Sequence, residues 1–561
     1  MLQTRLLSSM HRVLPGSCPQ TGISRLSAAK NEPLSFQVAF KTDGERETQV
    51  YIETECKLPL NTYTVGYVPI VHTDRYGLDT YHAPGLYPDK LLKRQTNPEH
   101  IKVMTNGGCY TWEKGAPAPL HALSDMWQSA WFIVNEDRVT VKAGTYEIAV
   151  RFFRAADDTL LAQEKLTLEV IDTALLPQKL MYTNWFHCDC LADEYGVEMF
   201  GDRFFELFRE WVHTAAKNGM NMLLLPAFTP ALDTPVGQER RTAQLVKIEK
   251  NGDEYSFDFS LMKKYIDIAR EAGITHFEHA HLYSQWGAKA APKIMATVDG
   301  TEKRIFGWET DAAGEEYNAF LRVYVKAVAA FLRGEGLEKN TLFHISDEPD
   351  KGNEEAYGKA FRAISKELDG FMLGDALSMY WYYENGLVPI PIVKTEEIEK
   401  YLGRCDHLWA YYTGGYYIPG GDDLSNRIPM LPGEMNRVIG VEMYANHVEG
   451  FLHWGYNYYY HHMGTVISNP DTNPLFYNGA GGAYCVYPGR NGECIQSIAQ
   501  KVFAEGIDDM RALETLEAKK GRAVCEEILR KYFGEKIDFR VVPKNPESML
   551  ALKSEILQAL K

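Results

Sequence analysis

From about residue 178 onward, apolar runs typical of buried strands alternate with amphipathic stretches typical of helices. This alternation constrains the fold more than any other feature, because strands joined through helices come to lie parallel in one sheet. Repeated units of this number fit a (β/α)8 barrel of the TIM type better than an open sheet. The strand-like runs cover residues 180–186, 220–226, 274–280, 341–346, 371–375, 406–411 and 450–456.

The rest of the chain has a different character at each end. Short runs of alternating polarity, separated by turn residues, fill residues 1–175 and predict an N-terminal β-sandwich. The barrel is expected to occupy residues 176–500, and helical patterns predict that residues 501–561 form a C-terminal helical segment packed on the barrel. A chain of 561 residues is too long for one core, so a multidomain α/β plus β protein is expected.

Charge and cysteine usage limit the partners and the compartment. The formal net charge is −16 and no basic stripe stands out, so we expect neither nucleic acid nor membrane as a partner. No secretory signal and no run long enough to span a bilayer is found. Nine cysteines without regular spacing indicate reduced thiols, which favours a cytoplasmic protein. The oligomeric state stays open.

One short segment, His187-Cys188-Asp189-Cys190, contains metal-ligand residue types. Its spacing is not that of a Cys-x-x-Cys pair, and alternation along a strand would send neighbouring side chains to opposite faces. We therefore expect no metal and no other cofactor.

An acidic pair, Asp347-Glu348, directly follows the fourth strand-like run. Two adjacent carboxylates each disfavour ionisation of the other, so one of them can stay protonated near neutral pH. A glycosidase needs this combination of one acid, which protonates the leaving oxygen, and one anion, which stabilises positive charge. The alternative is that the strand turns into a solvated loop and that Pro349 opens the next helix.

Other polar and aromatic residues follow the same strand-like runs. The active site of a (β/α)8 barrel lies at the C-terminal ends of its strands, so these residues are expected to surround the pair. Aromatic side chains around an acid pair fit a carbohydrate pocket, which makes a carbohydrate the expected substrate. The predicted substrate-binding residues are Trp185, His187, Asp375, Trp409, Tyr412, Trp454 and Tyr456; Glu278, His281 and the 381–383 group also stand at strand ends.

Adjacency of the two carboxylates limits the mechanism, because neighbouring residues cannot stand on opposite sides of a sugar. A sugar with a 2-acetamido group can supply its own nucleophile, the acetamido oxygen. Asp347 would then orient the acetamido N–H and stabilise the oxazolinium charge, and Glu348 would act as general acid and then as general base. Two inversions would give retention of configuration.

Several motifs carry a resemblance to glycoside hydrolase family 123 over nearly the whole chain. They are Ser346-Asp347-Glu348-Pro349 and the segments 450–457, 486–489 and 505–509. The resemblance implies a β-N-acetylgalactosaminidase that uses substrate assistance, with Asp347 as the stabilising residue and Glu348 as the acid/base.

Two rival interpretations stay open. A conventional retaining glycosidase, acting on a sugar without the acetamido group, could use Glu442 as its nucleophile, although residues 434–447 have a helical pattern. A catalytically inactive glycan-binding barrel is the other rival, but binding alone gains nothing from crowded carboxylates.

Overall fold

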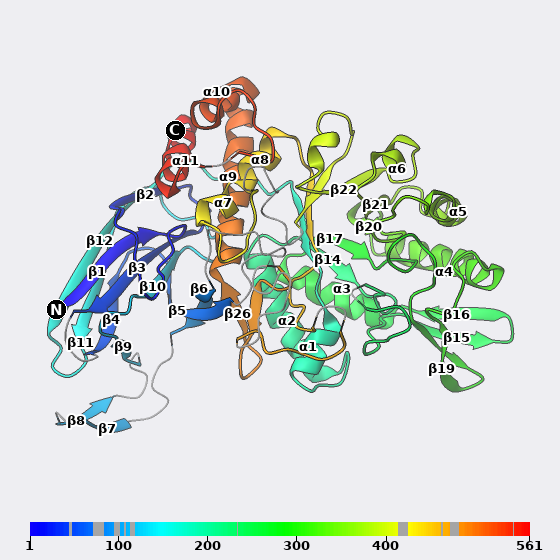
Figure 1. Ribbon diagram of the computed structural model, residues 1–561, viewed down its shortest axis with the longest axis horizontal. Helices are drawn as coiled ribbons and strands as arrows, with labels where there is room; N and C mark the ends of the chain where they lie inside the picture. The colour runs from blue at the N-terminus through cyan, green and yellow to red at the C-terminus, as the bar shows by residue number, and fades with distance from the viewer. Residues whose placement is uncertain are drawn as a thin grey trace. The chain divides into compact units, whose positions relative to one another are not determined.

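The computed structural model covers residues 1–561 and forms two compact units (Figure 1). The first unit contains Met1–Gln178, Gly421–Ala445 and Ile495–Lys561, and the barrel unit contains Lys179–Gly420 and Asn446–Cys494. For residues 101–105 and 108–112 only the backbone is described. The structure describes all residues except 44–47, 71–83, 95–100, 106–107, 113–117, 233, 413–423, 462–463, 472–481 and 542.

Two β-sheets make up the N-terminal part of the first unit, and one hydrophobic cluster contains side chains from both of them. The two sheets share a hydrophobic core, and the β-sandwich itself stays a prediction. One sheet has the order β1 (Leu2–Ser8), β3 (Leu34–Thr42), β10 (Gln128–Val134), β5 (Leu60–Ile70), β6 (Gly85–Lys93) and β26 (Cys494–Ser497). The other has the order β2 (Arg25–Ala28), β12 (Leu160–Val170), β11 (Gly144–Arg154), β4 (Thr48–Glu55) and β9 (Leu120–Ala122); β7 (Ile101–Thr105) and β8 (Gly108–Trp112) form a separate hairpin.

The C-terminal helices form and belong to the first unit together with the N-terminal sheets; their predicted packing on the barrel stays a prediction. Close helix packing explains part of this grouping. Helices α8 (Ile439–Ala445) and α9 (Ile498–Lys520) approach each other at Gly440 and Gly506. A Cβ atom on Gly440 would lie 1.8 Å from the carbonyl oxygen of Gly506. The helices of this unit are α7 (Gly433–Arg437), α8 (Ile439–Ala445), α9 (Ile498–Lys520), α10 (Arg522–Phe533) and α11 (Pro546–Leu560).

Buried ion pairs explain the rest of the grouping. Arg437 binds Asp509 through Nε at 2.7 Å and Glu505 through Nη1 at 3.1 Å. Lys553 on α11 binds Asp509 at 3.0 Å and Glu32, near the first sheet, at 2.5 Å. Segment 505–509, one of the motifs behind the family resemblance, therefore joins helices to the N-terminal sheets.

The barrel unit contains an eight-stranded parallel sheet whose strands follow one another around the barrel in chain order. Asn221, just before β14, nearly closes the sheet: its Oδ1 accepts the Tyr182 N–H of β13 at 2.8 Å, and its Nδ2 donates to the Leu180 carbonyl at 3.0 Å. The strands are β13 (Met181–Asn184), β14 (Met222–Leu225), β17 (His276–His279), β20 (Thr341–Phe343), β21 (Met372–Ala376), β22 (Ile390–Lys394), β23 (Trp409–Tyr411) and β24 (Gly450–His453).

Strand β22 is absent from the seven strands predicted, because Pro391 interrupts its apolar run. It is the sixth strand, so residues 409–411 form the seventh strand and the fourth strand keeps its predicted position. Segment 188–194, whose start was interpreted as part of a strand, is helix α1.

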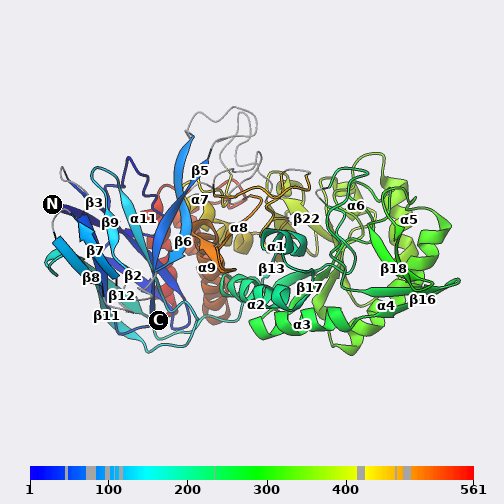
Figure 2. The ribbon, with the colours of Figure 1, turned by 90° about the horizontal axis from the view of Figure 1, so that it is seen from below.

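Helices α2 to α5 lie around the outside of this sheet (Figures 1 and 2). Only the short 3₁₀ turn η2 (Ile398–Lys400) separates β22 from β23, so the helical layer is less regular than the strands. The helices are α1 (Cys188–Glu194), α2 (Asp202–Lys217), α3 (Ser260–Ala272), α4 (Glu315–Gly334), η1 (Glu338–Asn340), α5 (Glu354–Ile364) and α6 (Tyr380–Glu384). Additional strands are β15 (Lys247–Asn251), β16 (Glu254–Asp258), β18 (Ile294–Val298), β19 (Thr301–Phe306) and β25 (Val486–Pro488).

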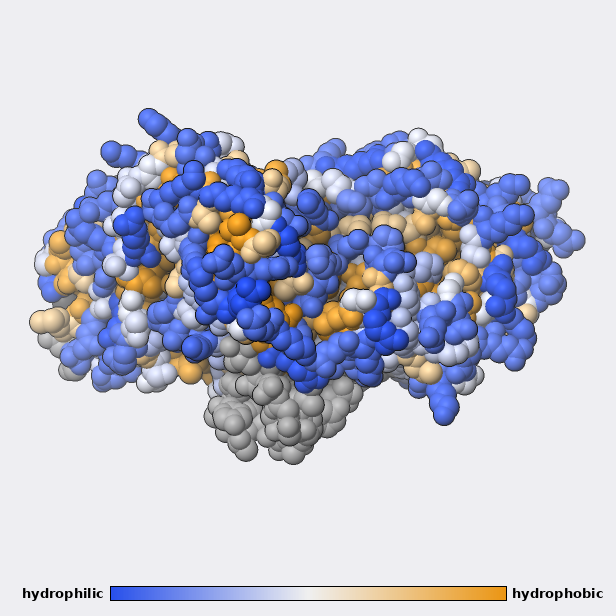
Figure 3. Space-filling view, turned by 90° about the horizontal axis from the view of Figure 1, so that it is seen from above, coloured by the Kyte–Doolittle hydropathy of each residue, from blue (hydrophilic) through white to orange (hydrophobic). Residues whose placement is uncertain are grey.

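Hydrophilic residues predominate on the face drawn in Figure 3, and hydrophobic residues appear there as scattered patches. Within the described part of the chain, no helix combines the length and the apolar character needed to span a bilayer.

Candidate active site

Asp347 and Glu348 lie just beyond the C-terminal end of β20, the fourth strand, where the sequence predicted them, and both side chains are half-buried. Two main-chain hydrogen bonds hold the pair. The Asp347 carbonyl accepts the Trp286 N–H at 2.8 Å, and the Glu348 N–H donates to the Ala376 carbonyl at 3.1 Å. Glu348 has a φ of 41°, a left-handed conformation that is costly for a residue with a Cβ atom. Strain of this kind concentrates at functional sites.

The carboxylate of Glu348 has a defined partner on the opposite side of the barrel. The Tyr411 hydroxyl, on β23, donates to Glu348 Oε1 at 2.5 Å. Burial raises the pKa of Tyr411 well above its usual value, and the negative charges of Glu348 and Asp347 raise it further. The phenol therefore stays protonated and acts as a donor that orients Glu348.

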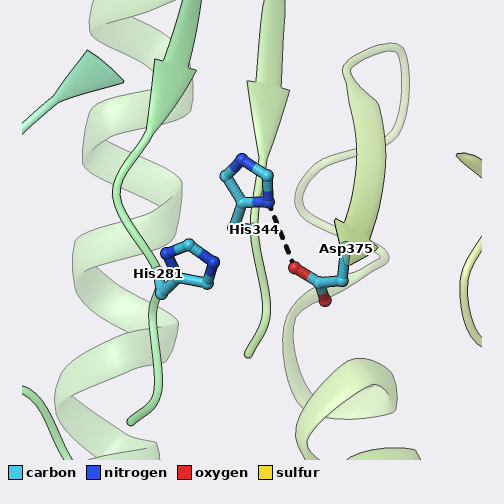
Figure 4. Close-up of side chains that lie close together, drawn as sticks. All are labelled: His281, His344 and Asp375. Carbon is cyan, nitrogen blue, oxygen red and sulfur yellow. Dashed lines mark hydrogen bonds and ion pairs between the residues drawn. The ribbon is translucent and has the colours of Figure 1, made fainter. Parts of the chain in front are cut away.

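A buried ionic network is centred on His344, and Figure 4 draws its bond to Asp375. His344 Nδ1 bonds to Asp375 Oδ1 at 3.2 Å and its Nε2 bonds to Glu278 Oε2 at 3.0 Å. Burial alone would lower the pKa of His344, but the bonds and charges of Asp375 and Glu278 outweigh it and raise the pKa to about 9. His344 is therefore an imidazolium between two carboxylates at neutral pH.

Asp375 connects this network to the acidic pair. Its carboxylate accepts the main-chain N–H groups of Ile345 and Ser346 at 3.0 to 3.2 Å, and it also accepts the hydroxyl of Tyr357. Burial raises the pKa of Asp375, whereas the bonds from His344 and Tyr357 oppose this rise. Because these contacts fix residues 345 and 346, they also fix the backbone direction of the acidic pair that follows.

Glu278 is the second anionic side chain of the network. It is fully buried at the end of β17 and accepts the Trp185 indole N–H at 2.9 Å and the hydroxyl of Thr183. Strands β13, β17, β20 and β21 thus contribute to one connected group of hydrogen bonds. Four strands that are separated in the chain are therefore held together at the C-terminal end of the barrel strands.

His281, His344 and Asp375 have possible metal-ligand atoms within 4.8 Å of one another (Figure 4). Both nitrogens of His344 and both oxygens of Asp375 are already engaged in hydrogen bonds. His281 stacks on His344 at 4.4 Å, and burial together with the charge of His344 lowers its pKa well below the usual value. In this cluster, the charged ring of His344 therefore stacks on the neutral ring of His281.

The predicted substrate-binding residues fall into three groups. Trp185 and Asp375 belong to the buried network, and Trp454 is half-buried beyond β24. The other four are buried and make packing contacts: Trp409 with Gly450, Tyr412 with Phe451, Tyr456 with Phe186, and His187 with the Trp454 carbonyl and Tyr458. Burial also lowers the pKa of His187 to about 4.

The sequence placed both Tyr411 and Tyr412 at this strand end and favoured Tyr412 as the binding residue, but Tyr411 is the one that contacts Glu348. Trp409 and Tyr411 share one face of β23 and belong to the hydrophobic cluster of the barrel unit. The period-two alternation of a strand could have separated Tyr411 from Tyr412. No local sequence signal marks His344 as the cation between Glu278 and Asp375, because its partners come from two other strands.

Glu442, the nucleophile of the conventional rival mechanism, lies on α8 in the first unit. It is buried and accepts the Ser425 hydroxyl at 2.6 Å, and burial raises its pKa to about 8. A buried, uncharged carboxyl group on a helix outside the barrel unit does not match the role of a barrel nucleophile.

A parallel eight-stranded barrel with an acid pair beyond its fourth strand has the fold and the site of a barrel glycosidase. The model of the glycoside hydrolase 123 catalytic domain matches residues 185–516, which is more than half of the chain. The protein therefore belongs to glycoside hydrolase family 123, as its motifs predicted.

Several solved structures match this chain, and one from the same family is similar in fold. A family 123 glycoside hydrolase from Clostridium perfringens, studied for glycolipid glycan hydrolysis, is 13% identical, with a TM-score of 0.71 over 100% of this chain and 97% of its own. A family 39 glycoside hydrolase from Bacteroides cellulosilyticus WH2 is 9% identical, with a TM-score of 0.33 over 88% of this chain and 82% of its own. No curated protein matches the sequence.

Proposed function

We propose that this glycoside hydrolase removes terminal β-linked 2-acetamido-2-deoxy sugars, with N-acetylgalactosamine favoured, by substrate-assisted catalysis with retention. Asp347 orients the acetamido group, whose oxygen attacks the anomeric carbon. Glu348 gives its proton to the leaving oxygen and then takes a proton from the incoming water. Membership of family 123 supports the choice of sugar, and the Clostridium perfringens relative acts on glycolipid glycans.

This proposal rests on the burial and the hydrogen bonds of four carboxylates in the barrel unit. Asp347 and Glu348 are adjacent and half-buried, whereas Glu278 and Asp375 are fully buried and bonded to His344. A conventional retaining mechanism needs a second carboxylate about 5 Å from the acid, on the other face of the sugar. Glu278 and Asp375 are buried and bonded to His344, so neither meets that requirement. A nucleophile supplied by the substrate is therefore favoured.

One other carboxylate near the site can be tested directly as a candidate nucleophile. Glu396 lies just beyond β22, and its charge is among those that raise the pKa of Tyr411. A conventional mechanism that employed Glu396 would use it as the nucleophile. Replacing Glu396 with Gln should then abolish turnover, whereas the substrate-assisted mechanism expects an effect on KM and retained turnover.

A comparison of substrates tests the mechanism itself. If the 2-acetamido group is replaced by hydroxyl in an otherwise identical aryl β-glycoside, kcat/KM should fall by at least about 10⁴-fold, because the intramolecular nucleophile is lost. Initial rates on the matched pair of glycosides measure this ratio. A thiazoline analogue of the oxazoline should also inhibit the enzyme competitively. Equal rates on the two substrates would exclude substrate assistance.

The cysteines support a reducing compartment. All eight whose side chains the structure describes are free, and six of them are buried. We therefore propose that the protein acts in the cytoplasm, on short glycans and from the non-reducing end. Fractionation of the native cells, followed by detection of the protein with an antibody, tests the location.

A further inference from the structure

Two tryptophans of the barrel unit expose a large part of their side chains. Trp286 is 46% exposed and Trp381 is 38% exposed, and they are the only exposed tryptophans in the described part of the chain. Trp286 lies in the segment that follows β17, and Trp381 lies on α6, which follows β21. Since β17 and β21 are the two neighbours of β20 in the sheet, these indoles come from both sides of the segment that carries the acidic pair.

The backbone around Trp286 is tightly held. Its N–H donates to the Asp347 carbonyl at 2.8 Å, and two residues later the Ala288 N–H donates to Ser346 Oγ at 3.0 Å. Between them, Gly287 has a φ of 99°, and a Cβ atom there would lie 2.3 Å from Asn353 Cγ. The loop is therefore attached to the catalytic segment on both sides of the glycine.

The conformation of Trp286 itself is strained. Its φ is 58°, a left-handed value that costs a bulky residue about 1 to 2 kcal/mol. Nearly half of the side chain is exposed, and the described residues make no ring stacking contact with the indole. A strained residue with an exposed apolar side chain beside a catalytic pair indicates a role in binding.

Trp381 is attached to the same segment from the other side. The hydroxyl of Tyr382, the next residue on α6, donates to the Asp350 carbonyl at 2.8 Å. The Tyr382 ring also packs edge-on against Tyr357, the residue that bonds to Asp375. The helix that presents the second indole is thus fixed to the loop immediately after the acidic pair.

We infer that Trp286 and Trp381 are the stacking surfaces for sugar rings on the aglycone side of the cleaved bond, with Trp286 beside the ring joined to that bond. This inference rests on the proposed function. The apolar C–H face of a pyranose fits a planar indole. Glu348 gives its proton to the leaving oxygen, so the leaving sugar lies beside the 347–348 segment, and exposed indoles meet the part of the glycan that extends into solvent.

The test compares two substrates with the same terminal 2-acetamido sugar. One is a trisaccharide, and the other is the methyl β-glycoside, which has no sugar on the aglycone side. For Trp286→Gly, the ratio of kcat/KM on the trisaccharide to kcat/KM on the methyl glycoside should fall by about 10- to 100-fold. Trp286→Phe keeps an aromatic face and should restore most of the ratio, and Trp381→Ala should lower it by a smaller factor.

Glycine accepts a positive φ without strain, so the melting temperature of Trp286→Gly should stay within about 2 °C of the wild type. A purely structural role for the indole would instead lower the melting temperature and leave the ratio unchanged, and that result would overturn the inference alone. A wild-type protein that cleaves neither substrate would overturn the proposed function and this inference together. A reduced ratio with an unchanged melting temperature supports both.

Discussion

Replacing Glu348 with Gln is expected to lower kcat/KM on a 2-acetamido disaccharide by about 10³- to 10⁴-fold, the usual contribution of a general acid–base residue. The amide has nearly the same shape and can still accept the Tyr411 hydroxyl, so binding and folding should change little. Steady-state kinetics and inhibitor titration of the same preparation measure both effects. Turnover within tenfold of the wild type would show that Glu348 is not the acid/base.

The neighbouring Asp347→Asn variant is the matched control, because it removes a charge one residue away. We expect a loss of about 100-fold or more, since the amide cannot stabilise the developing oxazolinium charge. Azide distinguishes the two roles: it needs no general base, so it should increase turnover of an activated aryl substrate by Glu348→Gln and yield a β-glycosyl azide. The same anion should not rescue Asp347→Asn, whose defect precedes nucleophilic attack on the intermediate.

Replacing His344 with Phe is expected to destabilise the barrel unit by about 3 to 5 kcal/mol, because it leaves two buried carboxylates without their cation. Phenylalanine keeps the ring that stacks on His281, so lost packing contributes little. Urea unfolding followed by tryptophan fluorescence measures the change. Tyr357→Phe is the matched control: it removes one neutral donor to Asp375 and should cost only about 1 to 2 kcal/mol.

The same variant predicts a specific change in the dependence of stability on pH. The pKa of His344 is raised from 6.5 to about 9 on folding, so its stabilising contribution is complete below pH 6.5 and is lost as the pH rises through 9. The wild type should therefore lose about 3 kcal/mol of this contribution over that interval. His344→Phe should lack the loss, and a parallel decline in both proteins would show that His344 is not charged in the folded state.

The barrel could be predicted because its strands and helices are local patterns. The runs at 220–226 and 274–280 are apolar and are bounded by helical periodicity, and both form strands, β14 and β17. Strand β22 escaped prediction because Pro391 breaks its pattern, although the side chains of Ile390 and Ile392 pack into the barrel cluster. A proline in a parallel strand is tolerated when tertiary packing outweighs the lost main-chain hydrogen bond.

The predicted ring of binding residues stays a prediction, and the structure adds how deeply two of its members are buried. Trp409 and Tyr456 follow strand-like runs, but both are fully buried in packing contacts. A strand presents alternate residues to opposite faces, and composition alone does not tell which face points to a pocket. Trp286 gave no sequence signal, since its importance lies in a positive φ and in a bond to Asp347.

By itself, the sequence determined the βα order, the family motifs and the adjacency of Asp347 and Glu348, because all three are properties of residues close together in the chain. Only the tertiary structure decided what surrounds the pair. Tyr411, His344, Glu278 and Asp375 stand on four strands, and their distances depend on how the sheet curves toward closure. The same closure buries Glu278 and Asp375, and burial in a low-dielectric interior makes a charged histidine between them necessary.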